Sequence, residues 1–202
     1  MIRVLLVLDT GVTRAALAAV LGQDAAIDVE EATLHEAPYR LRSSRPDVCV
    51  VDAECAGTGG RRALPDLFGS YARETVGKVL VLVPAGKPGL MYWAHRARAR
   101  GFVDADGTPA ALAQAIRRVA EGERIVDGTL APGLLDATER PMTPRELSVL
   151  ELAAEGTPIA EIAGCLHLSH GTVRNYLADA SRKLGARNRV DAIRLCRRAG
   201  WI

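Results

Sequence analysis

Short runs of branched apolar residues recur through the first half of the chain, and they constrain its fold more than any other feature. Residues 2–8, 47–51 and 78–83 are almost entirely apolar. Continuous runs of this length are typical of parallel strands that are buried on both faces. Segments with the apolar spacing of helices, such as residues 108–121, lie between them. The sequence therefore predicts alternating strands and helices.

This alternation predicts an α/β fold with a doubly wound, parallel, five-stranded sheet. The expected strands lie near residues 2–8, 27–32, 47–52, 77–83 and 101–104. Sites in such sheets lie at the carboxyl ends of the strands. Asp9 and Asp52 both fall at such ends, so they are the candidate site residues of this part of the chain.

The pattern changes after residue 121. Residues 122–142 contain several Gly and Pro residues and lack a regular period, which predicts a linker. The pattern then becomes purely helical, beginning with the capping-box residues Thr143 and Glu146. The expected organisation is a regulatory domain over 1–121, a linker over 122–142 and an all-α four-helix domain over 143–202.

Charge is unevenly distributed along the chain. The net charge is only +2, but residues 169–198 hold eight Lys or Arg against two Asp, a local charge of +6. Such an excess predicts a polyanionic partner. No run reaches the roughly 18 apolar residues of a membrane span, and the N-terminus lacks the features of a signal peptide. We therefore expect a cytoplasmic protein with no membrane contact.

The segment that begins at Ser169 is predicted to be a two-faced helix. One apolar stripe faces the domain core: Val173, Leu177, Ala180 and Leu184. The opposite side presents Arg174, Asn175, Ala178 and Arg182. Arginine can bond bidentately to a guanine edge and asparagine to an adenine edge. The residues better suited to phosphates are Ser169, Thr172, Lys183, Arg187 and Arg189. A short turn joins this helix to the preceding one, as in helix-turn-helix proteins that read the major groove of double-stranded DNA.

Residues 143–202 resemble the LuxR/NarL/FixJ-type helix-turn-helix. The matching residues are Thr143-Pro144-Arg145-Glu146, Val149-Leu150, Glu155-Gly156, Glu161-Ile162-Ala163, Leu168-Ser169, Gly171-Thr172-Val173-Arg174-Asn175-Tyr176 and Lys183-Leu184-Gly185-Ala186-Arg187-Asn188-Arg189. The Arg-Asn-Tyr-Leu run and the closing Gly200-Trp201-Ile202 are most similar to the DesR-like branch. The resemblance implies that Arg174, Asn175 and Ala178 face the bases. A sigma-factor-like helix-turn-helix is the nearest alternative, but it does not normally follow an α/β domain.

Residues 1–121 resemble a receiver domain, the CheY/flavodoxin-like phosphoacceptor module of response regulators. Arg45-Pro46-Asp47 leads the third strand into Asp52, which stands at the phosphoacceptor position. In that family an acidic pair after the first strand joins the acceptor in holding Mg²⁺. Here Asp9 and Asp52 are the remaining metal candidates, so we expect at most weak Mg²⁺ binding and no required cofactor.

Several positions depart from the receiver pattern. One member of the acidic pair is Leu8, the expected hydroxyl residue is Val83, the expected lysine is Ala105, and a usual proline is Ala56. Val83 and Ala105 cannot supply the hydrogen bond and the ion pair through which phosphorylation rearranges the surrounding loops. The resemblance therefore implies a degenerate, atypical receiver whose control does not depend on phosphorylation.

These features together predict a sequence-specific transcriptional regulator of the response-regulator type. A homodimer is expected, because one small helix-turn-helix reads too few bases for useful selectivity. The last helix, and the helices near 12–22 and 108–121, are the candidate dimer interfaces.

Three alternatives remain open. One is a conventional phosphorylation-dependent regulator that is served by a histidine kinase. Another is a regulator that senses a small-molecule effector near Met91, Tyr92, Trp93 and Phe102, although such aromatics are more often core or interface residues. A hydrolase or phosphotransferase with an aspartate nucleophile is disfavoured because the chain carries Asp52-Ala53-Glu54 rather than Asp-x-Asp. We therefore do not expect an enzyme.

Overall fold

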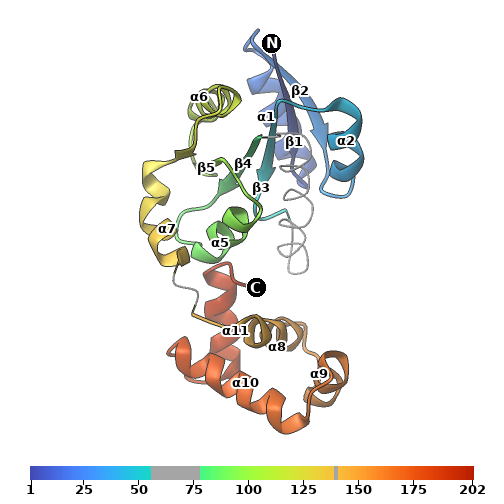
Figure 1. Ribbon diagram of the computed structural model, residues 1–202, viewed down its shortest axis with the longest axis vertical. Coiled ribbons are helices and arrows are strands. Elements are labelled where there is room, and N and C mark those ends of the chain that lie inside the picture. Colours follow the sequence, from blue (N-terminus) through green and yellow to red (C-terminus); the bar gives the residue numbers. More distant parts are fainter. Residues whose placement is uncertain (56–77, 139–140) are drawn as a thin grey trace.

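The computed structural model describes residues 1–55, 78–138 and 141–202. Figure 1 shows a part built around a sheet at one end of the molecule and a helical part at the other. The C-terminus lies between the two parts, close to helix α5 (Pro88–Arg96). None of the described helices is both long and apolar enough to cross a membrane.

The described strands form one parallel sheet in the order β2-β1-β3-β4-β5-β6. The strands are β1 (Ile2–Val7), β2 (Ile27–Ala32), β3 (Val48–Asp52), β4 (Lys78–Val83), β5 (Gly101–Asp104) and β6 (Ile125–Val126). The doubly wound α/β prediction is confirmed. The sheet contains the five expected strands and gains a sixth, because β6 pairs with β5 through Gly101 and Ile125.

Helices cover both faces of the sheet, which explains why its central strands are almost entirely apolar. Leu5 and Val7 of β1 point into a cluster with α2 (Ala37–Ser44), α5 and α7 (Ala131–Thr138). Val4 and Leu6 point into a second cluster, with α1 (Gly11–Leu21) and α6 (Pro109–Ala120). Successive residues of one strand thus enter two different cores.

The sequence predicts an irregular linker over 122–142, but this segment holds regular elements. It contains β6, the short 3-10 helix η1 (Gly128–Leu130) and α7. Pro132 stands in the first turn of α7, where a missing backbone N–H is tolerated. A Cβ on Gly133 would lie 3.1 Å from Sδ of Met91, so this glycine allows close packing on α5. The residue types that suggested a linker therefore begin and pack a helix.

Residues 143–202 form four helices, as predicted: α8 (Pro144–Ala154), α9 (Ile159–Leu166), α10 (His170–Lys183) and α11 (Arg189–Arg198). The expected capping box starts α8. The Thr143 hydroxyl accepts from the backbone N–H of Glu146 at 3.3 Å, and the Glu146 carboxylate accepts from the N–H of Thr143 at 2.7 Å. Val173, Leu177 and Ala180 are buried in the core of this domain.

Candidate nucleic-acid interface and receiver pocket

Helix α10 presents the predicted reading face to solvent. Arg174, Asn175, Ala178 and Arg182 are all exposed, whereas Val173 on the opposite face is fully buried. The helix packs against α8 and α9, and these contacts fix its direction. An exposed, convex helix of this kind can enter a major groove.

The turn before α10 has the geometry of a helix-turn-helix. His167 ends α9 in the left-handed region, with φ of 54°. Two residues later, the Ser169 hydroxyl caps α10 by accepting from the N–H of Thr172 at 3.1 Å, and the two hydroxyl oxygens lie 2.9 Å apart. The N-terminus of α10 is therefore both capped and exposed, and its dipole favours a nearby phosphate.

Lys183, which was predicted to contact phosphates, has an acidic partner within the protein. Its ammonium donates to both carboxylate oxygens of Glu146 at 2.8 Å. Burial opposes ionisation of Glu146, but the hydrogen bonds from Lys183 and Thr143 prevail and lower the pKa of this carboxyl. Lys183 thus ties the end of α10 to the start of α8. This role was missed in the sequence because the two residues lie far apart in the chain.

Asp191 organises the basic residues at the start of α11. Its carboxylate accepts from the N–H of Arg187 at 3.1 Å and from Nη2 of Arg194 at 2.8 Å. The Arg194 and Arg187 hydrogen bonds lower the pKa of Asp191 to about 2. Among the residues described, Arg174 and Arg189 have no acidic partner, so their charges remain available to a polyanion.

The carboxyl ends of β1 and β3 bring Asp9 and Asp52 near each other, at a place that we call the acceptor site. Oδ1 of Asp9 accepts from the N–H of Leu34 at 2.9 Å, and Oδ1 of Asp52 accepts from the N–H of Glu54 at 2.8 Å. Burial raises the pKa of Asp52, and the nearby charges of Glu54 and Asp9 act in the same direction. The charge of Asp9 thus lies close enough to disfavour ionisation of Asp52.

Cys55 contacts Asp9 and Lys87 pairs with Glu54 beside the acceptor site, and neither was among the candidates from the sequence. Sγ of Cys55 accepts from the N–H of Asp9 at 3.0 Å, and burial raises the pKa of this thiol to about 12. The ammonium of Lys87, which precedes α5, forms an ion pair with Glu54. The ion pair places the cation of Lys87 beside Glu54, which lies two residues after Asp52. Lys87 precedes α5, whereas the receiver pattern has its lysine after β5.

The positions that depart from the receiver pattern have apolar or exposed surroundings. Leu8 is 3% exposed and lies in the cluster under α1 and α6, whereas Val83 is fully buried in the cluster on the other face. Ala105 is exposed. Ala56 lies outside the described residues.

The donors at the acceptor site do not fit the Mg²⁺ site that a receiver fold implies. One oxygen of each carboxylate already accepts a backbone N–H, and the third acidic position is the buried Leu8. Within 1–55, 78–138 and 141–202, no group of three or more His, Cys, Asp or Glu side chains could hold a metal ion.

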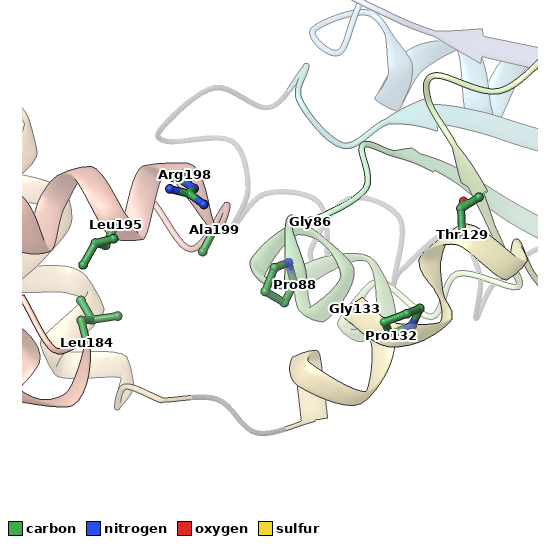
Figure 2. A pocket seen from close by; sticks show the side chains of 9 residues that line it. All are labelled: Gly86, Pro88, Thr129, Pro132, Gly133, Leu184, Leu195, Arg198 and Ala199. Atoms are coloured by element: carbon green, nitrogen blue, oxygen red, sulfur yellow. The ribbon is translucent and has the colours of Figure 1, made fainter.

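Three of the four side chains considered for an effector site are buried in cores, and Tyr92 is partly buried against both of these cores. Met91 and Phe102 are buried in the sheet domain, and Trp93 is buried in the core of the helical domain. A cleft of about 510 Å³ does lie between the two domains (Figure 2). Its walls include Pro88 and Pro132 on one side and Leu195 and Arg198 on the other.

Comparisons with known proteins agree with this architecture. The family described as "Bacterial regulatory proteins, luxR family" matches residues 140–196. The chain is 45% identical to the response regulator RamR of Streptomyces coelicolor over 208 residues, covering all of this chain and 98% of RamR. It is 36% identical to the transcriptional regulatory protein DesR of Bacillus subtilis over 165 residues, covering 80% of this chain and 78% of DesR.

Two solved structures of response regulators share this fold over nearly the whole chain. The response regulator ChrA of a heme-sensing two-component system is 28% identical, with a TM-score of 0.55, covering all of this chain and 98% of ChrA. The response regulator RcsB in a DNA complex is 21% identical, with a TM-score of 0.63 and 98% of each chain covered, and it supports the fold alone. The chain therefore belongs to the LuxR family of DNA-binding transcriptional response regulators.

Proposed function

We propose that this protein is a sequence-specific transcriptional regulator that binds its operator without phosphorylation of Asp52. The observation that carries this proposal is the surroundings of Val83 and Ala105. Val83 is completely buried by apolar neighbours, and Ala105 ends in an exposed methyl group. Neither side chain can donate a hydrogen bond to a phosphoryl oxygen. A phosphoryl group shifts a conformational equilibrium only by its differential interaction with the two states.

The reading face supports direct contact with DNA. We assign base contacts to Arg174 and Asn175, whereas Ala178 offers a methyl group suited to a thymine methyl. Ser169, Thr172, Arg182, Arg187 and Arg189 are assigned to the DNA backbone. Lys183 shares its ammonium with Glu146, so we expect it to contribute less than Arg189. Contact with chromosomal DNA would place the protein in the cytoplasm.

A homodimer is part of the proposal. RcsB, which shares the fold, has been solved as two dimers bound to two parallel DNAs. In this chain, Val190 on α11 is 70% exposed and Val12 on α1 is 84% exposed. Two of the three predicted interfaces thus expose a large apolar side chain that a second copy would cover.

The test of phosphorylation independence uses the full chain with Mg²⁺ and beryllofluoride, a phosphoryl mimic. Operator affinity and sedimentation are compared with those of the untreated protein and of Asp52→Ala. We expect equal affinities. A gain of tenfold or more, worth about 1.4 kcal/mol, that disappears in Asp52→Ala would contradict the proposal and indicate a conventional switch served by a histidine kinase.

The test of DNA reading compares two exposed arginines without acidic partners. Arg174→Ala should lose about 1–3 kcal/mol of operator binding and relax the preference for operator over random DNA. Arg189→Ala should weaken binding to both sequences alike, because a phosphate contact carries no sequence information. Unchanged discrimination in Arg174→Ala would refute the assignment.

A further inference from the structure

Both tryptophans of the chain lie where the two domains meet. Trp93, on α5 of the sheet domain, is 8% exposed, and Trp201, near the C-terminus, is 3% exposed. Tyr92 stands between them, with ring centroids 5.0 Å from Trp93 and 5.6 Å from Trp201. Ile202 is 1% exposed in the same cluster. A terminal segment that frays in many domains is therefore buried here.

Two glycines bring the backbones of the domains into direct contact. The N–H of Gly89, in the first turn of α5, donates to the carbonyl of Ala199 at 2.9 Å. A Cβ on Gly89 would lie 2.4 Å from the carbonyl carbon of Gly200. Gly200 itself has a φ of +75°, and a Cβ there would lie 2.8 Å from Cγ of Leu90. Only glycine fits at either position without a shift of the opposing segment.

This contact is local, because a cleft borders it. Figure 2 shows Leu184, Leu195 and Arg198 of the helical domain on one side of the cleft, facing Pro88, Pro132 and Gly133 of the sheet domain on the other. Direct contacts between the two domains join α5 to the segment 199–202. We call this contact the interdomain brace.

The brace leaves the DNA-reading face open. Arg174, Asn175 and Ala178 remain exposed while the brace is closed, so the sheet domain does not cover them. The N-terminal part of α11, including Val190, also stays exposed and can meet a second copy. A closed brace is therefore compatible with DNA binding, and it fixes the direction of α10 relative to the sheet domain.

We propose that the interdomain brace holds the DNA-binding domain in the arrangement that binds the operator, so that opening it weakens operator binding. This inference rests on the proposed function. A domain on a flexible tether must be ordered when it binds, whereas a braced domain is ordered beforehand.

The brace also begins next to the acceptor site. Lys87, which pairs with Glu54, is the N-cap residue of α5, and its carbonyl accepts from the N–H of Leu90 at 3.1 Å. A Cβ on Gly200 would lie 3.3 Å from Cβ of Lys87. The ion pair therefore links the end of β3 to the residues that carry the brace.

The sharpest test adds one methyl group. In Gly89→Ala the new Cβ would meet the backbone of residues 200 and 201, which cannot yield as a flexible side chain would, while alanine favours the helix α5. Gly128→Ala is the matched control, because a Cβ there meets no atom within 4 Å. Gly200→Ala blocks the same contact from the other side and carries the test if Gly89→Ala does not fold.

Tryptophan emission, circular dichroism and operator affinity are measured for the full chain. We expect Gly89→Ala and Gly200→Ala to retain helix content, shift the emission to longer wavelength and bind the operator about tenfold more weakly. Gly128→Ala should match the wild type. Unchanged emission in the two variants would contradict the proposal. It would also be contradicted if these variants bound the operator at least as tightly as the wild type. Failure of the wild-type protein to prefer operator DNA would instead refute the proposed function, and it would leave the emission shift intact.

Discussion

The ion pair between Glu146 and Lys183 should respond very differently to the loss of each partner. The Glu146 side chain is 5% exposed, whereas that of Lys183 is 36% exposed. If Glu146 loses its charge, the ammonium can turn towards water. If Lys183 is removed, the carboxylate stays buried. The loss of Lys183 should therefore destabilise the protein more than the loss of the charge on Glu146.

The magnitudes follow from the remaining hydrogen bonds. In Lys183→Met the buried carboxylate keeps the N–H of Thr143 and loses both bonds from the ammonium, which should cost about 2–3 kcal/mol of unfolding free energy. In Glu146→Gln the amide oxygen still accepts from Thr143, so the cost should be about 1 kcal/mol. Removing the more exposed partner should therefore be more damaging.

Urea unfolding at pH 7, followed by circular dichroism, measures both losses. The matched control is Arg182→Met, which breaks the exposed pair with Asp179 and should cost less than about 0.5 kcal/mol. Because the pKa of Glu146 is lowered in the folded state, its stabilisation is complete above the unfolded pKa. It is lost as the pH falls through the folded value, and Glu146→Gln should lack this loss. Equal losses in the two variants, or a larger loss in Glu146→Gln, would refute the reasoning.

Three further outcomes are expected. The slope of log operator affinity against log salt should be about −5 to −7, since two DNA-binding domains each neutralise roughly three or four phosphates; a slope near zero in a binding titration would contradict this. Asp191→Asn should lower the melting temperature at pH 7 and lose the part of the acid sensitivity that Asp191 supplies, since its stabilisation fades as the pH falls towards about 2; identical pH profiles would argue against it. Val190→Asp should shift the sedimentation of the protein towards monomer, because it charges a side chain that is 70% exposed on α11; an unchanged dimer would exclude this interface.

The elements that the sequence predicts well are those in which one physical requirement acts on neighbouring residues. Leu5 and Leu6 enter two different cores, so a buried parallel strand is visible as an unbroken apolar run. Thr143 and Glu146 satisfy each other's backbone groups three residues apart, so the start of α8 is visible as a capping box. Burial and capping requirements that act on neighbouring residues leave patterns that can be recognised in the sequence.

Contacts between distant segments leave weaker signals. Gly89 and Gly200 are separated by more than a hundred residues, and each alone is typical of a turn or a helix end. Lys87 and Cys55 reach the acceptor site because the sheet brings the ends of β1, β3 and β4 together. The same limit applies to the ion pair of Lys183 with Glu146, because the two residues lie on different helices and far apart in the chain.

Under the proposed function, Leu8 and Val83 explain why a phosphoryl group would have little to act on. They occupy polar positions of the receiver pattern, yet they lie in the two cores on opposite faces of the sheet. A hydroxyl restored at position 83 would be buried among apolar neighbours, and an unpaired hydroxyl there would cost about 1–3 kcal/mol. Under the same proposal, this packing holds the ends of β1 and β4 in one arrangement. Control of DNA binding would then act at a contact that can open, and the interdomain brace at Gly89 and Gly200 is the contact that we propose for this role.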